Sequence, residues 1–235
     1  MIDFATFLEQ TDIWAVLLTV MAYGTGTFLQ ERVKKPWCNP LLIACMTLVV
    51  FLTMAEVPYS LYKEKTSMLN YLLMPATVSL AIPLYEQWQL LKKNVLAIIC
   101  GIGAGALTSV VCILVMAWVF RMEPQYAVSL MPKSVTTAIG ADVATELGGI
   151  AALTAGVIIL TGIVGNLLAS SLCKLLHITD PVAKGVAIGT SSHAIGTSKA
   201  LEMGQVEGAM SSLAIALAGI MTAVIVPVLA QFLPQ

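Results

Sequence analysis

Charged residues are scarce in this sequence, and whole segments lack them. Only 11% of the 235 residues are charged, against about a quarter in a soluble domain. Six windows of at least 18 residues contain no charge at all: 13–30, 36–55, 66–85, 95–120, 147–173 and 208–235. A helix needs roughly 20 apolar residues to cross a bilayer, where an open backbone has no partner. The sequence therefore predicts an all-α polytopic membrane protein with about six spanning helices.

Signatures of several other protein classes are missing. A net charge of −1 without a basic patch argues against nucleic-acid binding. "GIGAGA" (101–106) lies inside an apolar run with no strand before it, so it indicates close helix packing rather than a dinucleotide site. Ser192 and His193 are adjacent and lack a GxSxG elbow, which does not suit a hydrolase pair. We therefore expect no enzyme, no cofactor and no metal.

The five cysteines lack CxxC spacing and lie mostly within apolar runs: Cys38, Cys45, Cys100, Cys112 and Cys173. This pattern favours free thiols that pack in the lipid phase, with a disulfide as the alternative.

Lysine and arginine are distributed unevenly between the apolar windows. The gaps 31–35 and 86–94 hold five of them, whereas 121–126 holds only Arg121. The positive-inside rule then predicts cytoplasmic 31–35 and 86–94 loops, an external 121–126 loop and an external N-terminus. Residues 1–14 carry acidic side chains and no basic ones, which argues against a secretory signal and for a retained first helix.

The segment 127–147 is unusually polar for its surroundings. If it crosses the membrane, Lys174 and Lys184 lie outside; if it re-enters, they lie inside, which fits the charge rule better. Pro132 and a run of hydroxyl residues also interrupt a helix there. We expect a re-entrant helical hairpin, which is tolerated only where protein or water surrounds it.

A near copy of part of this segment occurs 56 residues later. "AIGADVATELG" (138–148) and "AIGTSKALEMG" (194–204) share six of eleven residues, and "SVTT" (134–137) aligns with "TSSH" (190–193). Chance similarity between alanine- and glycine-rich segments is the alternative. The repeat predicts a second broken segment at 182–205 and an inverted pair, 127–173 and 182–235. The predicted domains are thus a scaffold of about four spanning helices (1–126) and a repeat pair (127–235).

Paired broken helices are common in secondary transporters, where helix ends meet near mid-membrane and hold a solute. Helix N-termini suit anions, and hydroxyls donate to carboxylates. The candidate substrate-binding residues are Lys133, Ser134, Thr136, Thr137, Thr190, Ser191, Ser192, His193 and Thr197. The alternatives are hydroxyls bonded to their own helix carbonyls, a lysine that reaches an interface and a histidine with a structural hydrogen bond.

Three carboxylates are candidates for coupling to a proton: Asp142, Glu146 and Glu202. A charge inside the membrane is costly and usually faces a cavity or a partner. The alternative is that Glu146 and Glu202, which match in the repeat, lie at hairpin ends in the headgroup region.

The motifs "LMPKSVTTAIG" and "GTSSHAIGTSKALEMGQVEGAMSSLAIALAG", with "NPLLIA" and "LMPATVSLAIPLYEQ" upstream, resemble the LrgB/CidB family. The likeness covers nearly the whole chain. It implies a bacterial inner-membrane protein, antiholin-like, that works with a small LrgA/CidA-type partner in controlling murein hydrolases and autolysis. Related proteins resemble carriers of pyruvate, glycolate and glycerate. Two hypotheses follow: a proton-coupled carrier of a small monocarboxylate, or an antiholin-like regulator in an oligomeric, holin-like assembly.

Overall fold

The computed structural model describes residues 11, 13–33, 40–79 and 81–234. These residues form helices joined by short turns, with no strand among them. The predictions for residues 1–10, for Cys38 and for Lys34 and Lys35 lie outside the described residues. The chain divides into two compact units, one through Ser79 and the other from residue 80 onward.

The described part of the N-terminal unit contains four helices: α2 (Ile13–Val33), α3 (Pro40–Met54), α4 (Tyr59–Lys65) and α5 (Ser67–Ser79). Gly26 lets α2 approach α3 closely, because a Cβ there would lie 2.6 Å from the Pro40 carbonyl oxygen. A hydrogen bond of 2.7 Å between the Thr19 and Tyr62 hydroxyls joins α2 to α4. This unit is therefore a small helical assembly built around α2.

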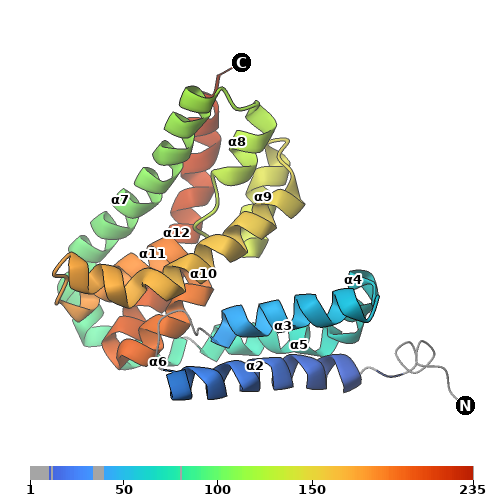
Figure 1. The fold of residues 1–235 in the computed structure, drawn as a ribbon. Helices are drawn as coiled ribbons and strands as arrows, with labels where there is room; N and C mark the ends of the chain where they lie inside the picture. The colour runs from blue at the N-terminus through green and yellow to red at the C-terminus, as the bar shows by residue number, and fades with distance from the viewer. Residues whose placement is uncertain (1–10, 12, 34–39, 80, 235) are drawn as a thin grey trace, which may run out of the picture. The chain divides into compact units, whose positions relative to one another are not determined.

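Residues 81–234 of the C-terminal unit contain seven helices. They are α6 (Ala81–Glu86), α7 (Trp88–Phe120), α8 (Pro124–Leu130), α9 (Thr137–Glu146), α10 (Ala151–Leu175), α11 (Pro181–Met203) and α12 (Gln205–Ala230). α7 and α12 run alongside each other, and α8 and α9 lie at the end where the chain terminates (Figure 1).

Glycines bring α11 and α12 together in this unit. A Cβ on Gly185 or Gly189 would collide with the backbone of Glu207 or Ser211, respectively. These glycines stand four residues apart, so they share one helix face. Small residues at that spacing let helices pack at close range in a membrane, where lipid tails are as apolar as leucine.

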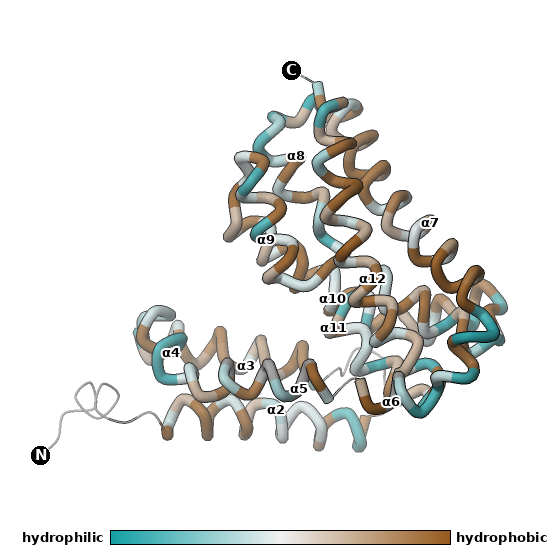
Figure 2. The backbone as a smooth tube through the Cα atoms, turned by 180° about the vertical axis from the view of Figure 1, so that it is seen from behind, coloured by the Kyte–Doolittle hydropathy of each residue, from teal (hydrophilic) through white to brown (hydrophobic). Residues whose placement is uncertain are grey.

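Among the described residues, four helices are long and apolar enough to cross a membrane: α2, α7, α10 and α12. The helical membrane class is thereby confirmed. Figure 2 shows hydrophobic residues along α7 and α12, and exposed apolar side chains such as Val119 and Val224 suit contact with lipid.

The described parts of two predicted windows form helices shorter than a full span. Window 36–55 yields α3, of 15 residues. Window 66–85 contains α5 and α6, and residue 80 between them lies outside the described residues.

The predicted domain boundary at residue 126 stays a prediction. α7 belongs to the same compact unit as the repeat pair because it packs against both α11 and α12.

Candidate functional site

The helices of the C-terminal unit are broken in both places where the repeat predicts a break. The first break is the stretch 131–136 between α8 and α9, which ends at Thr136 in an extended conformation (φ −66°, ψ 150°). Pro132 explains its position, because proline cannot donate to the carbonyl four residues earlier. The second break is a kink inside α11 at His193, with φ 42° and ψ −141°. Each copy is thus a short helix, a break, a second short helix and a long helix.

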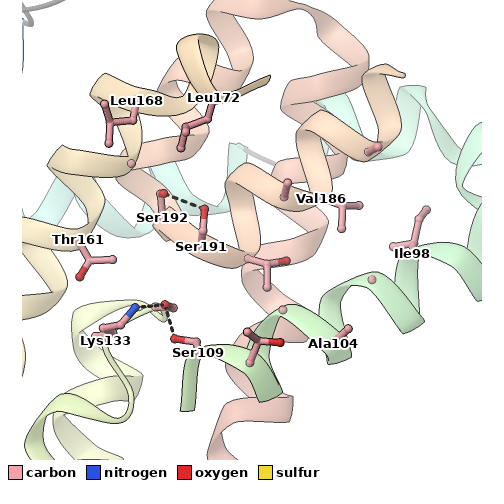
Figure 3. A pocket seen from close by; sticks show the side chains of 18 of the residues that line it. Ile98, Ala104, Ser109, Lys133, Thr161, Leu168, Leu172, Val186, Ser191 and Ser192 are labelled. Atoms are coloured by element: carbon pink, nitrogen blue, oxygen red, sulfur yellow. Dashed lines mark hydrogen bonds between the residues drawn. The ribbon is translucent and has the colours of Figure 1, made fainter. Parts of the chain in front are cut away.

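The two breaks border one cavity of about 1130 Å³, which lies entirely within the C-terminal unit. Its walls come from α7, the first break, α10 and the part of α11 before His193 (Figure 3). Its polar lining consists mainly of Ser109, Lys133, Ser134, Thr190, Ser191 and Ser192. Five of the nine predicted substrate-binding residues therefore lie on the same cavity, and they come from both copies of the repeat.

Hydroxyl pairs dominate the polar end of the cavity. The Ser109 and Ser134 hydroxyls are 2.9 Å apart, and those of Ser191 and Ser192 are 3.0 Å apart. Thr190 is 5% exposed, and its hydroxyl has no hydrogen-bond partner among the described residues. A buried hydroxyl without a partner costs free energy, about 1–3 kcal/mol, unless a ligand or water completes it.

Lys133 supplies the positive charge of the polar end. Its Nζ donates to the Ser134 hydroxyl at 3.4 Å. Among the described residues, no carboxylate lies within 4.0 Å of this nitrogen. The half-buried Lys133 ammonium has one weak hydroxyl partner, so N–H donors remain available to a ligand. The arrangement therefore suits a carboxylate or another anion, since hydrogen bonds between two charged groups are stronger than neutral ones.

The other four predicted substrate-binding residues do not line the cavity. The buried His193 ring lies with Nε2 2.9 Å from the Ile158 carbonyl oxygen. Thr197 donates to the His193 carbonyl at 3.0 Å and shares a hydrogen bond of 2.7 Å with Ser211. Thr136 is half-buried and Thr137 is exposed where α9 begins. His193 and Thr197 thus stabilise the second break. For His193 this matches the alternative interpretation, a histidine with a structural hydrogen bond.

None of the three predicted coupling carboxylates lines the cavity. Asp142 and Glu146 are exposed on α9. Glu202 is exposed and forms an ion pair of 2.7 Å with Lys199. Asp180 does line the cavity, but it also caps α11 by accepting from the Ala183 N–H at 2.8 Å. The carboxylate that lines the cavity therefore lies at the start of α11, away from both breaks.

Residues of α10 that the sequence reasoning missed support the second break. Asn166 is buried, and its side chain donates to the Ile195 carbonyl at 2.7 Å and to the Ser198 hydroxyl at 3.0 Å. Gly162 leaves room for the His193 ring, since a Cβ there would lie 2.8 Å from its Cε1. The sequence does contain a signal for Asn166. It is an amide side chain within an otherwise apolar window, and such a group needs a hydrogen-bond partner in the membrane.

The cysteines of the described residues are free thiols. Cys173 is buried, Cys45 is half-buried, and Cys100 and Cys112 are exposed. The first two therefore pack within the protein, whereas the exposed pair lies on α7.

A model of the LrgB-like family matches residues 19–232. Proteins named "Antiholin-like protein LrgB" from Bacillus mycoides (strain KBAB4) and Bacillus cereus (strain B4264) are 33% identical to the chain over 224 residues. The same identity holds for the protein of that name from Bacillus anthracis (strain CDC 684 / NRRL 3495). Each alignment covers 95% of this chain and 97% of the relative. No solved structure matches the chain.

Proposed function

Because the chain belongs to the LrgB-like family, we propose that it acts as an antiholin-like membrane protein. The single observation that carries the proposal is the match to proteins of that name over nearly the full length of both chains. A holin assembly makes a membrane permeable, and an antiholin opposes it. In this proposal the chain restrains a holin-like assembly of the bacterial inner membrane, and so limits murein hydrolase activity and autolysis.

The proposed partner is a small LrgA/CidA-type membrane protein, and the chain itself is proposed to form oligomers. Long apolar helices with exposed valine and phenylalanine side chains, as on α7, offer surface to lipid and to a second membrane protein alike. Association within a bilayer depends on close packing rather than on the hydrophobic effect.

Dye release from liposomes tests this function. Liposomes that contain the holin-like partner alone should leak a trapped dye, and addition of this chain at equal density should slow the leak. An unrelated polytopic protein at the same density is the control. Unchanged leakage, or leakage caused by this chain alone, would refute the antiholin role.

We also propose that 127–147 re-enters the membrane and that the two repeats are inverted. Helices α8 and α9 have 7 and 10 residues, too short to cross separately, and their break reaches the cavity also bordered by α11. Single cysteines at Tyr126 and Thr145, near the outer ends of α8 and α9, should react with a membrane-impermeant reagent from the same side. Reaction from opposite sides would show an ordinary crossing instead.

A second function, a carrier of a small monocarboxylate, is favoured by one specific feature. The cavity combines Lys133, without a carboxylate partner among the described residues, with hydroxyls from both breaks. Proteoliposomes with the chain and its partner should take up labelled pyruvate or glycolate under a proton gradient. Uptake should fall in Ser134→Ala without loss of folded protein. Absence of saturable uptake would exclude the carrier and leave the antiholin role intact.

A further inference from the structure

The cavity is elongated and its two ends differ in chemistry. It follows α7 from Asn94 to Ser109 and α10 from Val157 to Leu172. Either stretch spans about 22 Å at 1.5 Å per residue. Lys133 and the hydroxyl pairs gather where Ser109 lies, and Asn94 and Asp180 lie at the other end. The long axis therefore leads from a cationic, hydroxyl-rich end through a middle section to a second polar end.

The middle section is apolar. On α10, Leu160, Val164, Leu168 and Leu172 recur at helical spacing and turn one face to the cavity. Val186 of α11 and Ile98 of α7 lie across from them (Figure 3). The four α10 side chains are 45–61% exposed, so their surface is available to an apolar ligand.

The size of the cavity exceeds what a three-carbon acid requires. Sites that enclose a drug-sized ligand measure about 300–1,000 Å³, and this one measures about 1130 Å³. An acid such as pyruvate would occupy the Lys133 end alone and would leave the leucine and valine wall bare. Burial of that wall by an apolar chain is favourable, by roughly 25 cal/mol for each Å² removed from water.

The charges of the lining limit the ligand to one acidic group. Lys133 is the cation of the described lining. Asp180 stands ten residues before Thr190 on α11, about 15 Å away along the helix. A second anionic group at the far end would therefore meet a carboxylate.

We propose that this cavity binds an amphiphile with a single acidic group, either a free fatty acid or an acidic lipid. The acid accepts hydrogen bonds from Lys133 Nζ and from the unpartnered Thr190 hydroxyl, and the apolar chain lies along Leu160, Val164, Leu168 and Leu172. The proposal concerns occupancy of the cavity and not transport, so it stands or falls separately from the antiholin and carrier functions.

Binding of a chain-length series to the full-length protein in phosphatidylcholine nanodiscs tests the proposal. The probes are acetate, pyruvate, hexanoate and dodecanoate, with dodecanol as the neutral amphiphile and empty nanodiscs as the background. Affinity should rise roughly three- to four-fold for each added methylene until the wall is covered. Dodecanol should bind more weakly than dodecanoate because it leaves Lys133 without an anion.

Variants separate the two ends of the site. Lys133→Gln should weaken dodecanoate binding at least ten-fold and leave dodecanol unchanged, and Thr190→Val, which keeps the shape, should weaken it several-fold. Lys199→Gln is the matched control, because that lysine pairs with Glu202 and does not line the cavity. Leu168→Gln should flatten the dependence on chain length. A dodecanoate with a photoreactive tail should label α10.

Equal affinity for pyruvate and dodecanoate would overturn the proposal and would indicate a site for small acids instead. Unchanged affinity in Lys133→Gln would overturn it as well, as would labelling confined to residues outside α10. If Lys133→Gln does not fold, Lys133→Arg and Thr190→Val provide the comparison. If phosphatidylglycerol in the nanodisc displaces dodecanoate, the natural ligand is an acidic lipid. If it does not displace dodecanoate, the natural ligand is a free fatty acid.

Discussion

The two breaks of the C-terminal unit arise from similar sequences but differ in structure. The first is a six-residue stretch, 131–136, whose Lys133 and Ser134 turn to the cavity. The second is a kink at His193, whose ring is buried against α10. The repeat aligns Ser134 with Thr190, and both line the cavity, but it aligns Lys133 with Gly189, which packs against α12. One repeat position therefore provides charge in one copy and close helix packing in the other.

The difference shows that a repeat can conserve a place for a break without conserving its mechanism. At the first break, proline removes a hydrogen bond from the backbone itself. At the second, no proline is present. The backbone carbonyl of Ile158 on α10 lies against the His193 ring, and the Asn166 side chain donates to the Ile195 carbonyl. Loss of the Asn166 amide should therefore affect the second break and not the first.

Gly189→Ala should have the largest effect. Its Cβ would collide with the Ser211 carbonyl oxygen and lie 2.8 Å from the Ala214 Cβ, so α11 and α12 would have to separate. We expect a loss of roughly 3 kcal/mol in the free energy of unfolding, measured by denaturation in mixed micelles. Gly156→Ala is the matched control, because nothing lies within 4 Å of a Cβ there. Equal stability of the two variants would contradict the close approach of α11 and α12.

Asn166→Ala tests the support that α10 gives to the second break. It removes the donor to the Ile195 carbonyl and to the Ser198 hydroxyl, which should cost about 2 kcal/mol. A cysteine placed at Ser198 should then react faster with a thiol reagent. The same substitution should not change the reactivity of a cysteine at Thr136, which belongs to the first break. Faster reaction at both positions would mean general unfolding.

The substitutions His193→Gly and His193→Ala should reverse the order of stability that glycine and alanine have within a regular helix. Within a regular helix, alanine is more stable than glycine by about 1 kcal/mol. At a φ of 42°, which side chains other than glycine rarely adopt, His193→Gly should instead be more stable than His193→Ala by roughly 1 kcal/mol. At the equivalent Thr137, which lies in α9, the usual order should hold. The usual order at His193 would mean that α11 is not kinked.

Lys199→Gln should have the smallest effect. The ion pair with Glu202 is 2.7 Å long, but Glu202 is 56% exposed and Lys199 is 26% exposed. A pair of this exposure contributes less than about 0.5 kcal/mol. Stability in the same denaturation assay should stay near that of the unaltered protein. A loss as large as that of Gly189→Ala would show that charge, and not packing, holds the second copy together.

Part of the site followed from the sequence. Pro132 and the repeat at an offset of 56 residues located both breaks, and Lys133, Ser134 and Thr190 all line the cavity. Asn166, Gly162 and Ser109 were missed because nothing within their own windows shows which neighbour they face. A histidine beside two serines has the same sequence pattern whether its ring faces a solute or a carbonyl. The sequence therefore predicts His193 among the ligand-binding residues, whereas its ring lies against a carbonyl.

The sequence by itself determined the membrane class, four of the long apolar helices and the positions of the two breaks. Each depends on local chemistry: the scarcity of charge, the missing N–H of proline and a repeated polar motif. Only the tertiary structure decided which polar groups share the cavity. A side chain on a helix turns by about 100° from one residue to the next, and a kink changes that direction again. Whether Ser192 faces the cavity while His193 faces α10 therefore depends on how the neighbouring helices pack.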